Sequence, residues 1–362
     1  MRLICLGPAP PPYSGTTVSY ALLLQDLGVA DQVQKVDSLN LQASKSASTL
    51  SKLVHSLVLT LVVWRRLFGA DLVLLNASNA RAIVAGFLLD SVCVLHRKPL
   101  VIRVFGGAFM EHLETAPGWR RWMAKRLLRR RLLLLQTHHS LGQVRDAYPD
   151  AMLEWFPNSR PVGQCSATLS LGRLEKGMPL RFFFAGNICR DKGIDVLLDI
   201  AERYRGKRFE LHLFGELQDG YTCNQLDNAS SQACRVIYQG VSPSTELIKK
   251  LHQYHALLFP TRFVGEGYPG VVLEALAHGI PVIASDWYAI PELIDETCGL
   301  LLPHDDPDTW IQVIEKFAEN PASLKSLSNG ALARSREFDS AFWNRQRLPE
   351  ILGTQIEGGA QT

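Results

Sequence analysis

The chain has 362 residues, of which 47% are hydrophobic and 20% charged, and its formal net charge is +3 at pH 7. This length predicts two domains of about 150 residues, each large enough to bury a core. The even spread of aliphatic residues excludes collagen, coiled coils and wholesale disorder, and the small net charge argues against a nucleic-acid partner. Seven scattered cysteines without a CxxC pair argue against a disulfide framework or a zinc site and favour a reducing compartment.

The N-terminal segment MRLICLGPAP carries one arginine and a short apolar run that ends in Gly-Pro. A signal peptide needs a longer apolar core and a small-residue cleavage site, so we expect a first strand here. The longest other apolar run, LVLTLVVW at 57–64, is far below the roughly 20 residues that span a bilayer. We therefore expect a buried helix at 57–64 and a cytoplasmic protein.

Strands and helices alternate along the first 160 residues. Short apolar segments typical of parallel strands lie at 3–6, 71–76, 99–105 and 132–136. Helical spacing begins at 17–27 and recurs between the later strands. We expect an open α/β sheet, and hence a first Rossmann-like domain over residues 1–160.

The segment WFPNSRPVGQCSA at 155–167 has no clear period and suits an interdomain linker. The pattern then restarts, with strands at 180–185, 209–214, 236–238, 256–259 and 281–285 and helices at 194–204, 245–253 and 270–277. A second Rossmann-like domain is expected over 161–340, followed at 341–362 by a helix and tail that cross back to the first domain. The predicted architecture is two doubly wound α/β domains facing across a cleft, with ligands at the carboxyl ends of the strands.

The densest signal is GEGYPGVVLEALAHGIPVIAS at 265–285. Glu266 and Glu274 are separated by seven residues, with Gly270 at an expected helix start and Gly279 as the C-terminal glycine. Both carboxylates can then face one pocket, where the N–H groups of the helix start favour an anionic or hydroxyl-rich ligand. The alternative is two solvated glutamates that flank a core helix.

This segment resembles the E-x7-E signature of retaining GT-B glycosyltransferases, most closely family 4, also called glycosyl transferases group 1. The resemblance extends to GNICRDKGIDVLL at 186–198 and to the proline-rich glycine loop at 7–15. It implies a GT-B fold and transfer of a sugar from a nucleotide-diphosphate sugar to a hydroxyl acceptor, with retention of configuration. The expected setting is cell-surface polysaccharide or glycolipid biosynthesis. The sugar nucleotide is a co-substrate, and no cofactor or metal is expected.

The resemblance also implies roles for single residues. Glu266 would contact the donor sugar near the reaction centre, Glu274 would bind the ribose hydroxyls, and Lys192 would neutralise the diphosphate. The first domain would hold the acceptor. The further donor-binding residues are Gly15, Gly186, Gly215, Gly267, Tyr268, Pro269 and Gly270.

The chain departs from the family pattern at Asn187, where relatives usually carry arginine. We expect Arg190 to supply the missing guanidinium beside Lys192 as a catalytic cation. The alternative for both cations is an exposed charged turn.

Two further departures lie in the first domain. Ser14 replaces the first glycine of a common Gly-Gly pair, although Gly15 is kept, and a plain structural turn is the alternative there. Phe105 stands where many relatives have a histidine that touches the donor sugar. Candidate acceptor-side residues are Arg103, Phe105, Gly106 and Gly107. A structural role is the alternative for Arg103 and for His112, and Asn158 matches an asparagine at the domain crossover.

Asp306-Pro307-Asp308 spells DxD, the metal-binding signature of a different glycosyltransferase fold. It follows an expected strand at 299–302, so we expect Asp308 to cap a helix that begins near Thr309. Since no other His, Cys or carboxylate cluster has ligand spacing, the sequence predicts a metal-independent enzyme.

The segment WRRWMAKRLLRRR at 119–131 holds seven Lys/Arg and no acid. Trp119, Trp122, Met123 and Leu127 fall near one helical face, a pattern that suits an anionic membrane surface. The alternative is a solvated helix with core-facing tryptophans. The expected partners are thus the sugar nucleotide, a glycan or lipid-linked acceptor, and the inner face of the cell membrane.

Two other functions stay open. A sugar-nucleotide epimerase of the same fold would need no acceptor, and a catalytically weak subunit would keep only the nucleotide site. The departures at Asn187 and Phe105 favour the weak subunit, whereas Glu266, Glu274 and Lys192 argue for an active transferase.

Overall fold

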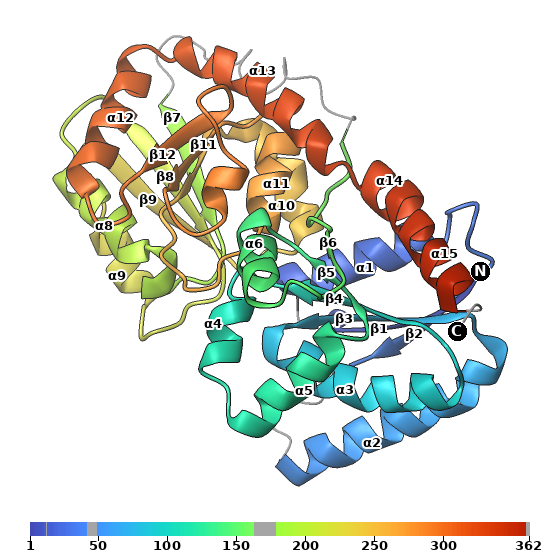
Figure 1. The fold of residues 1–362 in the computed structure, drawn as a ribbon. Helices are drawn as coiled ribbons and strands as arrows, with labels where there is room; N and C mark the ends of the chain where they lie inside the picture. Colours follow the sequence, from blue (N-terminus) through green and yellow to red (C-terminus); the bar gives the residue numbers. More distant parts are fainter. Residues whose placement is uncertain (12, 42–48, 163–178, 360–362) are drawn as a thin grey trace. The chain divides into compact units, whose positions relative to one another are not determined.

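The computed structural model describes residues 1–11, 13–41, 49–162 and 179–359 (Figure 1). The chain forms two compact units, Met1–Ser159 with Ser340–Thr362, and Arg160–Asp339. It therefore passes between the units twice, at 159/160 and at 339/340. Residues 163–167 of the expected linker, and Cys165 with them, lie outside the described residues.

The N-terminal unit is built on a six-stranded parallel sheet with the order β2-β1-β3-β4-β5-β6. The strands are β1 (Arg2–Gly7), β2 (Lys35–Asn40), β3 (Leu72–Ser78), β4 (Leu100–Phe105), β5 (Leu132–Leu135) and β6 (Leu153–Trp155). The four predicted strands are confirmed to within two residues. The sequence pattern misses the edge strands β2 and β6, because β2 is largely polar and β6 has only three residues.

Helices cover both faces of this sheet (Figure 1). They are α1 (Gly15–Leu27), α2 (Thr49–Arg66), α3 (Asn79–Leu95), α4 (Phe109–Glu114), α5 (Gly118–Leu128), α6 (His138–Ala147), α14 (Ser340–Phe342) and α15 (Leu348–Gly359). On one face α2, α3 and α5 contribute Val63, Val92 and Leu127 to the apolar core. On the other face Leu23 of α1 packs in one cluster with Ile351 of α15.

A buried charge ties the last segment of the chain to this unit. Asp26 on α1 is fully buried and accepts hydrogen bonds from Asn344 Nδ2 at 2.9 Å and Arg345 Nε at 2.7 Å. Both partners lie in the π-helical turn Trp343–Arg347 that precedes α15. The charged guanidinium offsets the cost of burying the carboxylate.

The apolar run at 57–64 lies within α2, as expected for a helix. Val63 is buried, but Leu61 and Trp64 are 65% and 39% exposed, so the prediction of a buried helix is wrong for this face. None of the described helices combines the length and the hydropathy needed to cross a bilayer.

The C-terminal unit holds a second six-stranded parallel sheet, with the order β12-β11-β10-β7-β8-β9. Its strands are β7 (Leu180–Ala185), β8 (Phe209–Phe214), β9 (Cys234–Gly240), β10 (Ala256–Phe259), β11 (Val282–Ser285) and β12 (Gly299–Leu302). Its helices are α8 (Ile194–Arg203), α9 (Cys223–Asn228), α10 (Ser244–Lys250), α11 (Gly270–Ala277), α12 (Pro307–Glu319) and α13 (Ser323–Ser335). The predicted fold class, two doubly wound parallel sheets, is confirmed.

The strand order fixes where a ligand can sit in this unit. The chain builds β7, β8 and β9 in one direction and then returns to add β10 beside β7, so the order reverses between these two strands. In open α/β sheets, ligands bind outside the carboxyl ends of the strands at such a reversal. The loops that follow β7 and β10 are therefore where a site is expected.

Candidate active site

The loops after β7 and β10 meet through an ion pair. Lys192 ends the short helical turn Arg190–Lys192 after β7, and Glu266 lies in the loop between β10 and α11. Lys192 Nζ donates to Glu266 Oε2 at 2.5 Å, and Glu266 is only 7% exposed. Two predicted catalytic residues that are 74 positions apart are thus in direct contact.

Neighbouring groups hold both members of this pair. Thr261 is fully buried, and its Oγ1 donates to the same carboxylate oxygen of Glu266 at 2.6 Å. Ser285 Oγ in turn donates to the Thr261 carbonyl. The Lys192 ammonium lies 4.6 Å from the centre of the Phe263 ring, within the range of a cation–π contact. A carboxylate with two charged or polar donors on one oxygen has a defined orientation.

Glu274 occupies a different position and has its own cation. It lies on α11 and is 4% exposed, and its Oε1 accepts a hydrogen bond from Arg160 Nε at 2.8 Å. Gly270 leaves room for this contact, because a Cβ there would overlap a guanidinium nitrogen of Arg160 in its present position. The sequence analysis does not identify Arg160, which is 114 residues from Glu274. The sequence holds only an indirect signal for such a partner. Glu274 lies inside an otherwise apolar helix, and a carboxylate buried there needs a cation.

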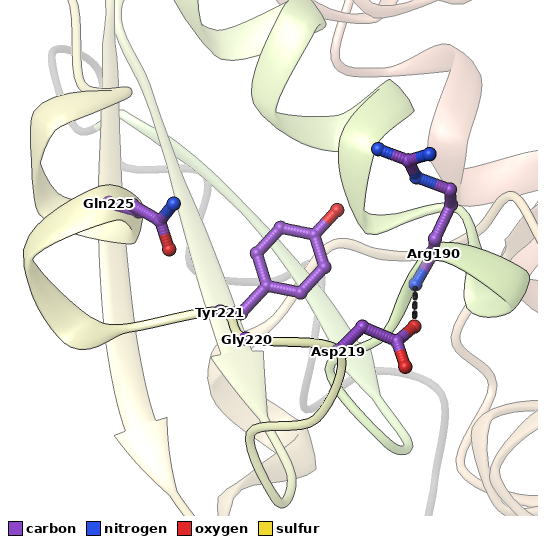
Figure 2. Close-up of a pocket in the computed structure, with 5 residues that line it drawn as sticks. All are labelled: Arg190, Asp219, Gly220, Tyr221 and Gln225. Carbon is purple, nitrogen blue, oxygen red and sulfur yellow. Dashed lines mark hydrogen bonds between the residues drawn. The ribbon is translucent and has the colours of Figure 1, made fainter.

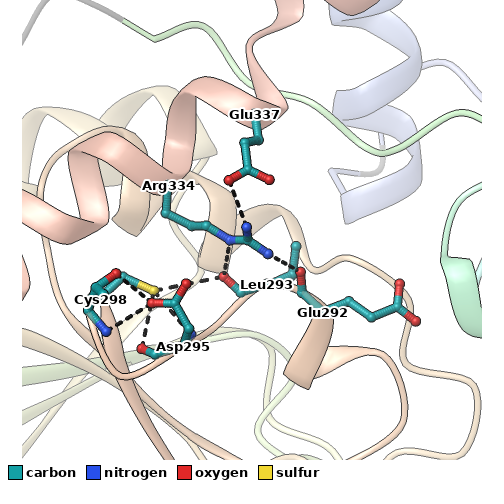
Figure 3. Close-up of polar contacts among 7 residues, drawn as sticks. Glu292, Leu293, Asp295, Cys298, Arg334 and Glu337 are labelled. Atoms are coloured by element: carbon teal, nitrogen blue, oxygen red, sulfur yellow. Dashed lines mark hydrogen bonds and ion pairs between the residues drawn. The ribbon is translucent and has the colours of Figure 1, made fainter.

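Tyr268 has its hydroxyl engaged within the C-terminal unit. Its Oη donates to Glu292 Oε2 at 2.5 Å, and its buried ring packs edge-on against Phe338. Arg334 supports the same region by donating to the Glu292 carbonyl at 2.6 Å and to the Leu293 carbonyl at 3.2 Å (Figure 3). The Tyr268 side chain is thus engaged with Glu292 and Phe338, so the predicted ligand contacts of the loop Gly267–Gly270 would come mainly from the backbone.

The predicted donor-site glycines after β7 and β8 lie against each other. Gly186 and Gly215 follow the two strands directly, and a Cβ on Gly215 would overlap the Gly186 carbonyl oxygen. Gly193 is in the left-handed region with a φ of 75°, and a Cβ there would overlap the Pro260 carbonyl. Glycine therefore permits the loops that follow β7, β8 and β10 to approach closely at the carboxyl edge of the sheet.

Arg190 lines a separate pocket. This pocket has a volume of about 430 Å³ and is lined by Arg190, Asp219, Gly220, Tyr221 and Gln225 (Figure 2). The Arg190 backbone N–H donates to Asp219 Oδ2 at 3.0 Å, and burial raises the pKa of the Tyr221 phenol. The structure thus does not bring the Arg190 side chain into the Lys192–Glu266 contact, and Asn187 is exposed.

In the N-terminal unit Gly15 is the first residue of α1, and Ser14 is its N-cap. The Ser14 side chain accepts from the Thr17 N–H, and the Ser14 N–H donates to Thr17 Oγ1 at 2.8 Å, which completes a capping box. Ser14, which stands where relatives commonly have the first glycine of a Gly-Gly pair, therefore serves as the N-cap of α1.

The acceptor-side candidates lie at the carboxyl end of β4 in the same unit. The Arg103 guanidinium is buried beside the rings of Phe105 and Phe156, at 4.6 and 4.8 Å from their centres, and it donates to the Pro157 carbonyl. These contacts favour the structural alternative for Arg103. The Gly106 N–H donates to Gln136 Oε1 at 3.1 Å, and the Gly107 carbonyl accepts from Ser140 Oγ at 2.6 Å.

The DxD segment caps a helix through a different residue than expected. The N-cap of α12 is Asp306, whose carboxylate accepts from the Thr309 N–H and Oγ1, whereas Asp308 lies inside the first turn and pairs with Arg203. The prediction of Asp308 as the cap is wrong, because the helix begins at Pro307. In the part of the chain that the structure describes, no group of three His, Cys, Asp or Glu side chains is placed to hold a metal ion.

The sequence is similar to those of known glycosyltransferases. Residues 179–320 match the family model described as "Glycosyl transferases group 1". The amylovoran biosynthesis glycosyltransferase AmsK of Erwinia amylovora is 26% identical over 184 residues, which cover 48% of this chain and 44% of that protein. The D-inositol 3-phosphate glycosyltransferase 1 of Catenulispora acidiphila is 29% identical over 234 residues, covering 60% and 53%. The chain thus matches about half the length of these curated relatives.

Solved structures resemble the chain over nearly its whole length. HepE of Anabaena, in complex with UDP, has a TM-score of 0.72 at 16% identity and covers 98% of this chain and 100% of its own. Sucrose-phosphate synthase of Thermosynechococcus elongatus has a TM-score of 0.75 at 15% identity, covering 99% and 100%. The fold is therefore GT-B, with two Rossmann-like sheets. Within the C-terminal unit, residues 179–320 resemble the group 1 glycosyltransferases.

Proposed function

We propose that this protein is a retaining glycosyltransferase that moves a sugar from a nucleotide-diphosphate sugar to a hydroxyl of a glycan or lipid-linked acceptor. The expected setting is cell-surface polysaccharide or glycolipid biosynthesis. The observation that supports this most directly is the Lys192–Glu266 contact at the strand-order reversal, with Glu274 on the adjoining α11. Since solved relatives are described with UDP and with UDP-glucose, a UDP-sugar is the first donor to test.

Different residues of the chain would have different roles in this reaction. Lys192 and the N–H groups at the start of α11 would stabilise the negative charge that grows on the departing diphosphate. Glu266 would hold hydroxyls of the transferred sugar. The bond from the sugar's anomeric carbon to the phosphate oxygen breaks as the bond to the acceptor oxygen forms on the same face. The acceptor's proton passes to the departing phosphate oxygen, so no side chain needs to act as a covalent nucleophile.

A catalytically weak nucleotide-sugar-binding subunit is the second candidate. It is favoured by the exposed Asn187 and by the separate pocket that Arg190 lines. Measuring nucleotide release from UDP-, GDP- and ADP-sugars, with and without acceptors, separates the functions. Acceptor-dependent release supports the transferase, and binding without release supports the weak subunit. Epimerised donor without release supports an epimerase. Repeating the assay with magnesium and with a chelator tests the predicted metal independence.

We also propose that the protein binds an anionic membrane surface, at the cytoplasmic face of the cell membrane. Trp119 and Trp122 on α5 are 53% and 58% exposed, so the alternative of core-facing tryptophans is wrong. Trp122 packs against Phe87 of α3, and Trp64 of α2 and Phe68 of the short turn Leu67–Gly69 after it pack against His96, the residue that follows α3. Exposed aromatic side chains thus lie along three neighbouring helices, beyond the predicted segment 119–131.

Charge on these helices favours the same partner. Residues 58–69, 79–98 and 118–131 hold twelve Lys/Arg and one acid, a net charge of +11, which leaves −8 for the rest of the chain. The one acid, Asp90, is buried and pairs with Arg131 at 2.5 Å. A basic surface with exposed tryptophans suits the headgroup region of an anionic bilayer.

The 362-residue chain should sediment with vesicles of phosphatidylcholine and phosphatidylglycerol and be released by salt. Replacing the exposed Arg121, Arg129 and Arg130 by Ser should weaken binding on the order of 10²-fold, at about 1 kcal/mol per charge. Arg131 is left intact, because it makes the short contact with the buried Asp90, whose other cation, Arg126, lies at 3.8 Å. The matched control replaces Lys207, Arg208 and Arg235, exposed cations of the C-terminal unit, and should bind normally. Equal binding to pure phosphatidylcholine vesicles would contradict the electrostatic role.

Glu266→Ala should mainly lower kcat, whereas Glu274→Ala should mainly weaken nucleotide binding. The difference follows because an interaction made with the reacting sugar in the transition state appears in kcat, and a ribose contact appears in affinity. A loss of roughly 10²-fold is expected for each. Steady-state kinetics and calorimetry with UDP measure the two effects. Wild-type rates and affinities in both variants would show that the site lies elsewhere.

Arg190→Ala should lower turnover by roughly 10²-fold if Arg190 replaces the family arginine that is missing at Asn187. Adding Asn187→Arg should restore part of the loss, and Arg190→Lys should rescue poorly, because a point charge cannot make a bidentate phosphate contact. Arg205→Ala, at an exposed site of the same unit, is the control. Near-normal turnover in Arg190→Ala would leave Arg190 as a solvated residue of its pocket.

A further inference from the structure

Glu274 is a buried carboxylate whose charge is balanced by an arginine from a distant segment. The side chains of Arg160 and Glu274 are 5% and 6% exposed, and the distance from Arg160 Nε to Glu274 Oε1 is 2.8 Å. Burying an ionised carboxylate without a cation is strongly unfavourable. The pair is therefore what allows a charged glutamate in the otherwise apolar run GVVLEALA of α11.

Arg160 is itself fixed in the C-terminal unit. Its backbone N–H donates to the Phe338 carbonyl at 3.0 Å, and its backbone forms an isolated parallel β-bridge with Asp339. Its guanidinium lies against the first residue of α11, where Gly270 leaves the space that a Cβ would fill. The planar guanidinium thus has a set position, and this position determines where the carboxylate points.

We propose that Arg160 is a positioning residue for the nucleotide, an inference that rests on the proposed contact between Glu274 and the donor ribose. Arg160 holds Glu274 through Oε1 in the one orientation that presents the carboxylate to the ribose hydroxyls. A carboxylate has about four lone-pair sites, so the contact with Arg160 does not exhaust its capacity as an acceptor. Arg160 then contributes to affinity through Glu274, and its contribution depends on the ribose hydroxyls.

Because the effect of Arg160 should depend on the ribose hydroxyls, nucleotides with and without these hydroxyls distinguish a positioning role from a merely structural one. Affinities of the full chain for UDP and for 2′,3′-dideoxy-UDP are measured by calorimetry in the wild type, Arg160→Gln and Arg160→Lys. Arg160→Gln should weaken UDP binding about tenfold or more, as expected for loss of an oriented charged acceptor, and should change dideoxy-UDP binding less than about threefold. Arg160→Lys should recover part of the UDP affinity. Retained dideoxy-UDP binding also shows that the variant is folded.

The control is Arg181→Gln, which removes a second Nε–carboxylate pair of 2.8 Å, to Glu210, near the N-terminal ends of β7 and β8. It should leave the affinities for both nucleotides unchanged. Equal weakening of UDP and dideoxy-UDP by Arg160→Gln, or no weakening of either, would overturn the role of Arg160 while the proposed function stands. Failure of the wild type to bind UDP, GDP or ADP would instead overturn the proposed donor site itself.

Discussion

Two buried carboxylates must be neutralised in the C-terminal unit, and the rest of the site depends on how this is done. Glu266 and Glu274 are 7% and 4% exposed, and taking a charge out of water costs several kcal/mol unless a cation compensates. Lys192 and Arg160 supply those cations from segments 74 and 114 residues away. Breaking either pair would leave a buried charge unpaired, at a cost of about 3–5 kcal/mol. The carboxylates can be kept only in a fold that brings these segments together.

The strand order provides that fold. Because β10 is added next to β7, the loop that ends in Lys192 and the loop that carries Glu266 leave the sheet from neighbouring strands. Close approach of these loops leaves no room for a side chain at Gly193, where a Cβ would overlap the Pro260 carbonyl. The contact between Lys192 and Glu266 therefore depends on the strand order and on the glycine between the loops. A change in either would displace Lys192 from Glu266.

The sequence allows the local features of this arrangement to be predicted but not its long-range pairs. Short apolar segments predict the inner strands, and Gly270 and Gly279 predict the bounds of α11, because both signals lie within a few neighbouring residues. The E-x7-E spacing is equally local. The resemblance implies a role for Lys192 and a role for Glu266, but their direct contact is seen only in the structure. Arg160 is missed, because nothing near it in the sequence shows that it faces Glu274. The exposed face of α2 is missed for a related reason, since an apolar run does not reveal which of its residues another helix covers.

The pairing also bears on how the proposed site would receive an anion. Without a ligand, Lys192 is neutralised by Glu266 and Arg160 by Glu274, so neither cation offers its full charge to an approaching diphosphate. A nucleotide that draws Lys192 toward its phosphates leaves Glu266 in need of new donors, and the hydroxyls of the attached sugar can supply them. Phosphate and sugar contacts would then be coupled through one ion pair. Such an exchange favours the intact sugar nucleotide over its nucleotide part, because only the intact donor satisfies both Lys192 and Glu266.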